Sequence, residues 1–179
     1  VRRVLQLSLL ASLLAGPAAA YDIGFVKLGN VPTGVGCYDI KVADLNGDGR
    51  PDAVSALNDQ VGVSVLFGNG SGIGPATFYS GGHAVAVDLA DYDGNGSIDI
   101  LESDWSENQI RLWKNQGDGT FIPGGTAIVL GHPRDVASGD LNGDGTPDLY
   151  VTGSQYPGGA IGSGLFLNNG DGTFASRSI

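Results

Sequence analysis

The sequence is poor in cross-linking residues, in basic residues and in long apolar segments. Cys37 is the only cysteine among the 179 residues, so no intramolecular disulfide can form. We expect a small buried residue there; the alternative is an intermolecular bridge. Nine basic residues stand against nineteen acidic ones, with a formal net charge of −10. Because phosphate binding needs clustered Lys and Arg, we expect no nucleic-acid partner. No apolar run reaches the roughly 18 residues of a membrane-spanning helix, so we expect no transmembrane segment.

The first 20 residues have the pattern of a secretory signal peptide. Arg2 and Arg3 supply a positive start, residues 4–15 form an apolar run, and residues 18–20 are alanines that suit a cleavage site. We therefore expect cleavage near Ala20 and a secreted protein, extracellular or periplasmic. The mature chain would then be residues 21–179.

Three short acidic loops recur along the chain. Their sequences are DLNGDGRPD at 44–52, DYDGNGSID at 91–99 and DLNGDGTPD at 140–148. The first residues of the loops are 47 and 49 positions apart. Near-constant spacing of this kind indicates a repeat protein.

Each loop has the residue types of a calcium site. Ca²⁺ takes about 6–8 oxygen ligands, often from one short loop. Positions 1, 3, 5 and 9 are always Asp or Asn, and they are Asp44, Asn46, Asp48 and Asp52; Asp91, Asp93, Asn95 and Asp99; and Asp140, Asn142, Asp144 and Asp148. Position 7 has unlike side chains, so we expect only the backbone carbonyl of Arg50, Ser97 and Thr146 to contribute. The sequence thus predicts about three Ca²⁺ sites. The alternative is three metal-free Asx turns, which Asp-Gly and Asn-Gly also favour.

Residues 91–102 also match the EF-hand pattern, with Gly96 at position 6 and Glu102 at position 12. The residues that align with Glu102 in the other repeats are Ser55 and Val151, and no flanking helix is predicted. We therefore interpret Glu102 as a strand residue and not as a calcium ligand.

The segments around the loops predict β-structure throughout. In the first repeat the apolar runs indicate strands at about 36–43, 52–57, 61–68 and 76–80, and similar runs recur in register in the other two repeats. The 31 glycines argue against long helices. Four strands in a repeat of about 45 residues are typical of a β-propeller blade, so the expected fold class is all-β.

The acidic loops, together with a second turn in each repeat, resemble the FG-GAP/VCBS repeats. The second turns lie at 69–72, 116–119 and 169–172, and Thr-Phe follows each of them. The resemblance implies calcium-binding blades of an integrin-alpha-like propeller at about 31–80, 81–125 and 126–179, with one strand of a further blade in 21–30. Closed propellers typically have 4–8 blades. We therefore expect a partial or open propeller, with either missing C-terminal blades or closure as a homo-oligomer.

Two histidines and one tryptophan are the candidates for ligand contact outside the loops. His83 and His132 each lie eight positions before an acidic loop, at the predicted entry of the innermost strand. Trp105 lies in the turn after the second strand of its repeat, where it could stack on a sugar ring. The structural alternatives are imidazoles hydrogen-bonded to the backbone and a tryptophan packed against neighbouring loops. We expect Trp113 to be a core residue.

No catalytic constellation is visible. The sequence has no G-x-S-x-G, no H-E-x-x-H and no phosphate-binding glycine loop, so we expect that the protein is not an enzyme. The resemblance implies a secreted, non-catalytic calcium-binding module for adhesion, or for recognition of a carbohydrate or protein surface. The alternatives are an accessory or catalytic propeller part of a larger secreted enzyme, or a structural component of a cell surface.

Overall fold

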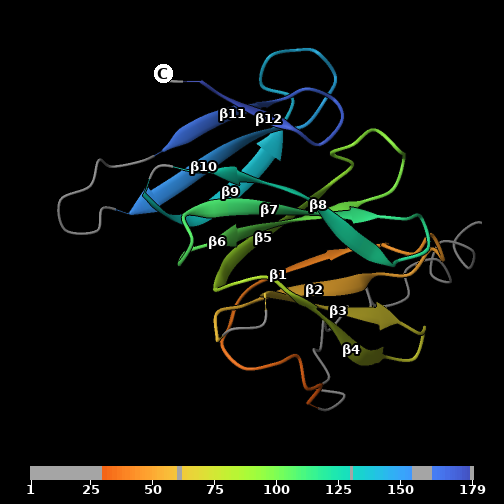
Figure 1. Ribbon diagram of the computed structural model, residues 1–179. Helices are drawn as coiled ribbons and strands as arrows, with labels where there is room; N and C mark the ends of the chain where they lie inside the picture. The colour runs from red at the N-terminus through yellow and green to blue at the C-terminus, as the bar shows by residue number, and fades with distance from the viewer. Residues whose placement is uncertain (1–29, 60–61, 130, 155–162, 178–179) are drawn as a thin grey trace, which may run out of the picture.

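A computed structural model describes residues 30–59, 62–129, 131–154 and 163–177 (Figure 1). Within these ranges the regular structure is β-strand alone, with no helix, so the expected all-β class is confirmed. No helix there could cross a membrane. The predicted signal peptide at 1–20 lies outside the described residues. The strand predicted in 21–30 lies outside them too, apart from its last residue.

The described strands form three four-stranded antiparallel sheets, each built from consecutive strands. The first sheet contains β1 (Cys37–Ala43), β2 (Asp52–Leu57), β3 (Gly62–Gly68) and β4 (Ile73–Ser80). The second contains β5 (Ala84–Ala90), β6 (Asp99–Asp104), β7 (Gln109–Asn115) and β8 (Phe121–Ile128). The third contains β9 (His132–Gly139), β10 (Asp148–Ser154), β11 (Gly164–Asn168) and β12 (Phe174–Arg177). These bounds agree with the strands predicted for the first repeat. The exception is β4, which starts earlier because an irregular pairing between Leu66 and Gly68 absorbs the added residues.

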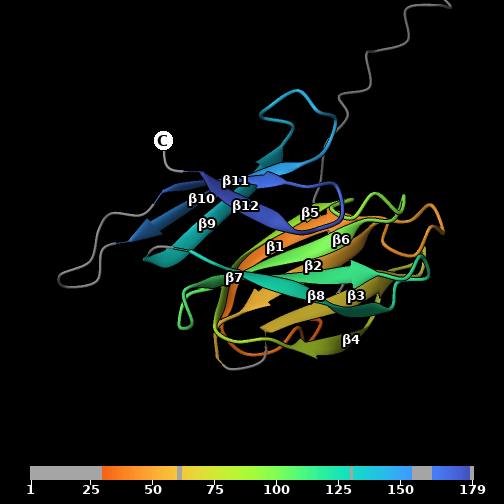
Figure 2. The same ribbon diagram turned by 45° about the horizontal axis from the view of Figure 1, so that its top comes forward.

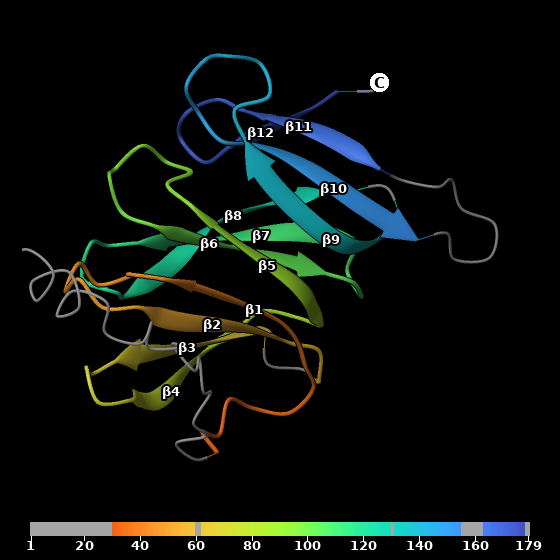
Figure 3. The same ribbon diagram turned by 180° about the vertical axis from the view of Figure 1, so that it is seen from behind.

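The three sheets lie face to face in chain order, as Figures 1 and 2 show. The first strand of each sheet lies beside the first strand of the next, so that β1, β5 and β9 form one side of the molecule (Figure 3). Each acidic loop follows one of these three strands. The stacking therefore brings the first loop close to the second sheet and the second loop close to the third sheet.

Two apolar clusters join the sheets. The first contains Val54 and Val65 of the first sheet together with Ile100 and Trp113 of the second, so the prediction that Trp113 is a core residue is confirmed. The second cluster lies between the second and third sheets and has no member in common with the first. Burying a single large aliphatic or aromatic side chain contributes about 1.5–3 kcal/mol, so these clusters hold the stack together.

Cys37 is exposed, which corrects the expectation of a buried residue. It begins β1 at a point where the pairing with β2 shifts register. A bulge re-aims the side chains around it, and the Cys37 thiol here reaches only the carbonyl oxygen of Asp39, at 3.8 Å.

Candidate functional site

Each acidic loop joins the first and second strands of its sheet and is closed by its first aspartate. The carboxylate of this residue accepts the backbone N–H of the glycine at position 6. The N···O distances are 2.8 Å for Asp44–Gly49, 2.8 Å for Asp91–Gly96 and 3.0 Å for Asp140–Gly145. These glycines have φ of 79°, 86° and 90°, in the left-handed region where a side chain is strained. The glycine at position 6 is therefore needed for the turn itself.

The side chains at positions 3 and 5 continue this pattern. In each loop the position-3 oxygen accepts the N–H of position 5, over 3.1 Å for Asn46–Asp48, 3.2 Å for Asp93–Asn95 and 2.8 Å for Asn142–Asp144. The position-5 oxygen then accepts the N–H of position 7 at 2.8–2.9 Å. These are Asx turns, as in the metal-free alternative. They are compatible with a cation too, because an ionised carboxylate has about four lone-pair sites.

The ninth residue of each loop has a second role that the sequence did not predict. Asp99 is fully buried, and its two carboxylate oxygens accept the N–H groups of Tyr92 at 3.0 Å and Asn115 at 2.8 Å. Asp52 and Asp148 make the equivalent pair of bonds. The ninth aspartate therefore ties the start of its loop to the end of the third strand of its sheet.

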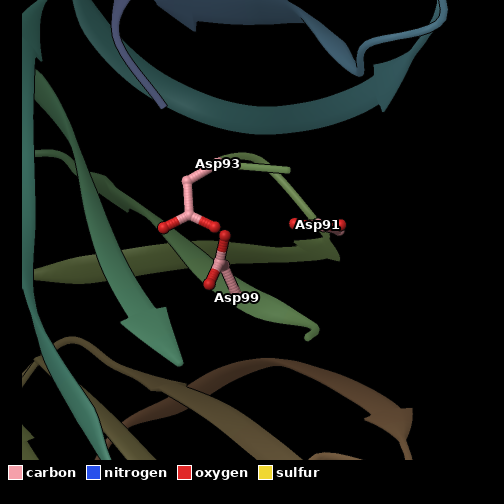
Figure 4. Close-up of side chains that lie close together, drawn as sticks. All are labelled: Asp91, Asp93 and Asp99. Atoms are coloured by element: carbon pink, nitrogen blue, oxygen red, sulfur yellow. The ribbon is translucent and has the colours of Figure 1, made fainter. Parts of the chain in front are cut away.

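The second loop brings three carboxylates together. Oxygens of Asp91, Asp93 and Asp99 lie within 4.8 Å of one another (Figure 4), and no other group of three acidic, histidine or cysteine side chains in the described ranges does so. Burial raises the pKa of Asp99 to about 6, and the charge of Asp93 adds to the rise, although the N–H groups of Asn115 and Tyr92 oppose it. A divalent cation would relieve this repulsion, so the donor set fits a hard cation such as Ca²⁺. The first and third loops have Asn at position 3 and lack this convergence.

A lysine that the sequence did not single out lies beside the second loop. Lys114 Nζ is 3.4 Å from Asp93 Oδ2 and 2.8 Å from the carbonyl oxygen of Asp171. The aligned residues in the other sheets are Phe67 and Leu167, so this ammonium group is particular to the second loop. Its charge partly compensates the acidic cluster and competes with an added cation.

Two asparagines at the ends of third strands connect neighbouring sheets. Asn115 Nδ2 donates to the carbonyl of Leu45 in the preceding loop at 2.7 Å, and Asn168 Nδ2 donates to that of Tyr92 at 2.8 Å. Both side chains are buried. Sequence reasoning missed these two asparagines. The pattern that could have identified them is the residue directly before each second turn, which is Gly68 in the first repeat and Asn in the other two.

The remaining predicted contact residues lie directly before β5, at the start of β9 and in the turn after β6. His83 Nδ1 is 3.1 Å from Asn58 Oδ1, and His132 Nδ1 is 2.7 Å from the carbonyl oxygen of Trp105. The rings of Trp105 and His132 stack with centroids 4.5 Å apart, and the guanidinium of Arg134 lies 5.8 Å from the Trp105 ring. This geometry resembles the packing alternative more closely than a free sugar-stacking surface.

Glu102 lies in β6, which confirms the prediction that it is a strand residue. Its buried carboxylate accepts hydrogen bonds from Arg111 Nη1 at 3.0 Å and Trp113 Nε1 at 2.9 Å, and it is absent from the acidic cluster. The match to the EF-hand pattern is therefore a coincidence of spacing.

Two segments of the chain, residues 44–102 and 104–151, match the family model of the FG-GAP-like repeat. Together they cover more than half of the 179 residues. No curated protein matches the sequence. Thirteen chains of solved structures match. One belongs to a structure of the Photorhabdus luminescens Tc holotoxin pore, with 22% identity and a TM-score of 0.44; the match covers 76% of this chain and 7% of that chain.

Proposed function

Because the chain belongs to the FG-GAP-like repeat family, we propose that it is a secreted, non-catalytic calcium-binding module that serves adhesion or recognition. The observation that carries the proposal is the convergence of Asp91, Asp93 and Asp99 to within 4.8 Å. Three carboxylates at this distance repel one another unless a cation or a proton compensates them. The repetition of the loop in all three sheets extends the proposal to three sites.

The residues that would hold the cation are those at positions 1, 3, 5 and 9 of each loop, with the backbone carbonyl at position 7. Their hard oxygen donors and loop flexibility suit Ca²⁺ better than Mg²⁺, which demands a stricter octahedron and retains its water. Bound calcium would supply positive charge that fixes the loop between the first two strands. The protein's own part is to hold the carboxylates in place through the backbone N–H groups described above.

We further propose that the three sheets are blades of a β-propeller arc. Supporting this arrangement are the four antiparallel strands of each sheet, the order of pairing and the adjacency of β1, β5 and β9. Blade-like stacking leaves loops and strand entries at the two ends of the sheets, where recognition surfaces of propellers can form. The ligand class would be a carbohydrate or a protein surface, and screening on a glycan array would separate these two.

Isothermal titration calorimetry of the full chain with CaCl₂ tests the calcium proposal. We expect binding of about three Ca²⁺ per chain, with Mg²⁺ at the same concentration binding much more weakly. The double variant Asp91→Asn/Asp93→Asn should lose one site. Asp118→Asn, the same change at an exposed aspartate outside the acidic loops, should keep all sites. Absence of calcium binding, or equal binding of Mg²⁺, would reject the proposal.

A further inference from the structure

A cavity of about 140 Å³ lies between the second and third sheets, beside β8 and the start of β12. The buried side chains of Leu101, Ile110 and Leu112 line its apolar floor, and the exposed Thr126 and Thr173 lie at its rim. Apolar concave sites with a few polar groups are typical of small-molecule binding. None of these residues belongs to an acidic loop, so the cavity is separate from the proposed cation sites.

An aromatic ring fills the corresponding space between the first and second sheets. Tyr79 in β4 and Ala127 in β8 occupy the same place in their sheets, because they pair with aligned residues of β3 and β7. The centroid of the Tyr79 ring lies 5.7 Å from that of Trp113 and 5.4 Å from that of Phe121. At the second junction a methyl group therefore replaces a phenol ring.

Two further substitutions enlarge the space at the second junction. Gly125 stands where the first sheet has Thr77, and a Cβ built on Gly125 would meet no described atom within 4 Å. Lys114 aligns with Phe67, whose ring reaches to within 2.7 Å of a Cβ built on Gly119. The ammonium group of Lys114 instead donates to a carbonyl in the β11–β12 turn. The second junction thus lacks three side chains that fill the first.

The aromatic wall against which Tyr79 packs is nevertheless kept at the second junction. Phe174 aligns with Phe121 and lines the cavity. Tyr92 lies against Phe174, with ring centroids 6.0 Å apart and an edge-to-face angle. Aromatic pairs favour this arrangement at centroid separations of about 4.5–7 Å. The cavity therefore combines an aromatic wall with a space that an aromatic ring fills in the neighbouring junction.

Glycines bring the backbone close to the cavity. A Cβ on Gly172 would lie 2.6 Å from Leu112 Cδ2, and a Cβ on Gly124 would lie 2.6 Å from Lys114 Cγ. Both residues line the cavity, and neither position has room for a side chain. Glycine is the residue that lets backbone approach a ligand closely, and walls made of backbone suit a planar group.

We propose that this cavity binds a small molecule with a single aromatic ring, of the phenol class. An apolar cavity of about 150 Å³ lined by Leu, Ile and Phe binds benzene, so about 140 Å³ is enough for one ring. The ring would lie against Phe174 as Tyr79 lies against Phe121, with its hydroxyl group at the polar rim. This activity goes beyond the proposed adhesion or recognition and does not depend on calcium.

Titration of the full chain with p-cresol tests the proposal, because p-cresol has the structure of a tyrosine side chain. Methyl ¹H–¹³C spectra are recorded in EGTA as p-cresol is added. We expect saturable shifts at the methyl groups of Leu101, Ile110 and Leu112, with a dissociation constant of about 1 mM or below, which a ligand of this size can reach. The methyl groups of Val54 and Val65, which pack at the first junction, should not shift.

Two tyrosine substitutions show whether the ligand occupies the cavity. Ala127→Tyr supplies the ring that Tyr79 supplies at the first junction, so the affinity for p-cresol should fall about tenfold or more, because one close-packed space cannot hold two rings. Ala175→Tyr is the matched control at an exposed alanine of β12. Its side chain points to the face opposite Phe174, so the affinity should be unchanged.

The methyl spectrum of the first junction reports whether each variant has folded. If Ala127→Tyr does not fold, Ala127→Leu replaces it, and the affinity for p-cresol should fall about threefold or more as the cavity is partly filled. The compound 4-methylcyclohexanol, which has the same skeleton without the flat ring, should bind at least about fivefold more weakly than p-cresol.

Three outcomes would overturn the proposal. The first is the absence of saturable shifts at the cavity methyl groups, or equal shifts at both junctions, which would indicate adsorption without a site. The second is undiminished affinity in a folded variant with Tyr or Leu at residue 127. The third is equal binding of p-cresol and 4-methylcyclohexanol, which would exclude selection for an aromatic ring.

Discussion

The second and third acidic loops have the same turn chemistry and different surroundings. In both, the first aspartate accepts the N–H of a position-6 glycine, and the ninth aspartate joins the loop to the third strand. Tyr92 in the second loop is nevertheless fully buried beneath the third sheet, whereas Leu141 in the third loop is exposed. The comparison shows that local sequence sets the shape of the loop, and that the next sheet sets its burial.

The same two loops differ in electrostatics. Burial raises the pKa of Asp99 in the second loop, where Asp93 lies close by. In the third loop, hydrogen bonds from the Thr146 hydroxyl and backbone, with a smaller one from Asn142, lower the pKa of Asp144. The second loop thus has clustered negative charge that Lys114 compensates only in part, whereas Asp144 of the third loop accepts hydrogen bonds from neutral donors.

The largest expected effect comes from removing the ninth aspartate. Asp99→Ala leaves two buried N–H groups without acceptors, each costing about 1–3 kcal/mol, so we expect a loss of roughly 3 kcal/mol in the free energy of unfolding. Asp148→Ala removes the same bonds beside the more exposed third loop, and we expect a smaller loss of roughly 2 kcal/mol. Urea unfolding in EGTA measures both. Equal losses in the free energy of unfolding would show that burial of the loop by the next sheet does not affect how much the ninth aspartate stabilises the fold.

Removing the asparagine that covers the second loop should have a smaller effect. Asn168→Ala leaves the buried carbonyl of Tyr92 unpaired, and we expect a loss of about 1–2 kcal/mol with faster hydrogen exchange in residues 91–99. Asn169→Ala is the control, because this exposed neighbour bonds only within its own turn. If exchange in 91–99 stayed unchanged, the interpretation of Asn168 as the residue that joins the sheets would be wrong.

Lys114 offers a way to sharpen the electrostatic difference. Lys114→Met removes the ammonium group 3.4 Å from Asp93, so calcium should bind the second loop about fivefold more tightly, an effect near 1 kcal/mol for a partly exposed charge pair. Arg50→Met is the matched control in the first loop, where the exposed guanidinium lies 3.3 Å from Asp48 and the gain should be smaller. Calcium titration of both variants checks this, and weaker binding after Lys114→Met would contradict it.

The parts of the structure that depend on local sequence were predictable. The strand bounds of the first repeat, the position of Trp113 in the core and the turn-forming side chains of the loops follow from hydrophobic pattern and Asx-Gly chemistry. The strand bounds and the loop turns need only contacts between residues close in the chain or within one repeat. The place of Trp113 in the core follows from the apolar pattern of its own strand, although its packing partners include residues of the first sheet.

The contacts between sheets were not predictable in the same way. Asn115 and Asn168 act on loops about 70 residues earlier, and Lys114 reaches a carbonyl of the third sheet. The exposure of Cys37 likewise goes with a shift in the pairing of β1 and β2 between Cys37 and Asp39. No residue pattern in the sequence predicts this shift. A single sequence does not reveal how neighbouring sheets are aligned. It therefore gives no reason to choose one polar residue over another as the one that contacts the next sheet.

The smallest expected effect concerns pH and the buried Glu102. Burial raises its pKa above the ordinary 4.5, so the folded state holds this proton more tightly than the unfolded state. The free energy of unfolding should therefore fall as pH rises from about 4.5 through the higher folded-state pKa. Glu102→Gln should flatten this part of the profile. Glu107→Gln, an exposed carboxylate 3.7 Å from the same Arg111, controls for loss of charge, and an unchanged profile in Glu102→Gln would contradict the assignment.

The central claim is that the acidic loops bind calcium, and thermal unfolding of the full chain tests it most directly. At a free Ca²⁺ concentration one hundred times the dissociation constant, each site should stabilise the folded state by about 2.7 kcal/mol. Calorimetry should therefore show a melting temperature several degrees higher in Ca²⁺ than in EGTA, with Mg²⁺ close to EGTA. A melting temperature that is the same in Ca²⁺ and EGTA would contradict the claim.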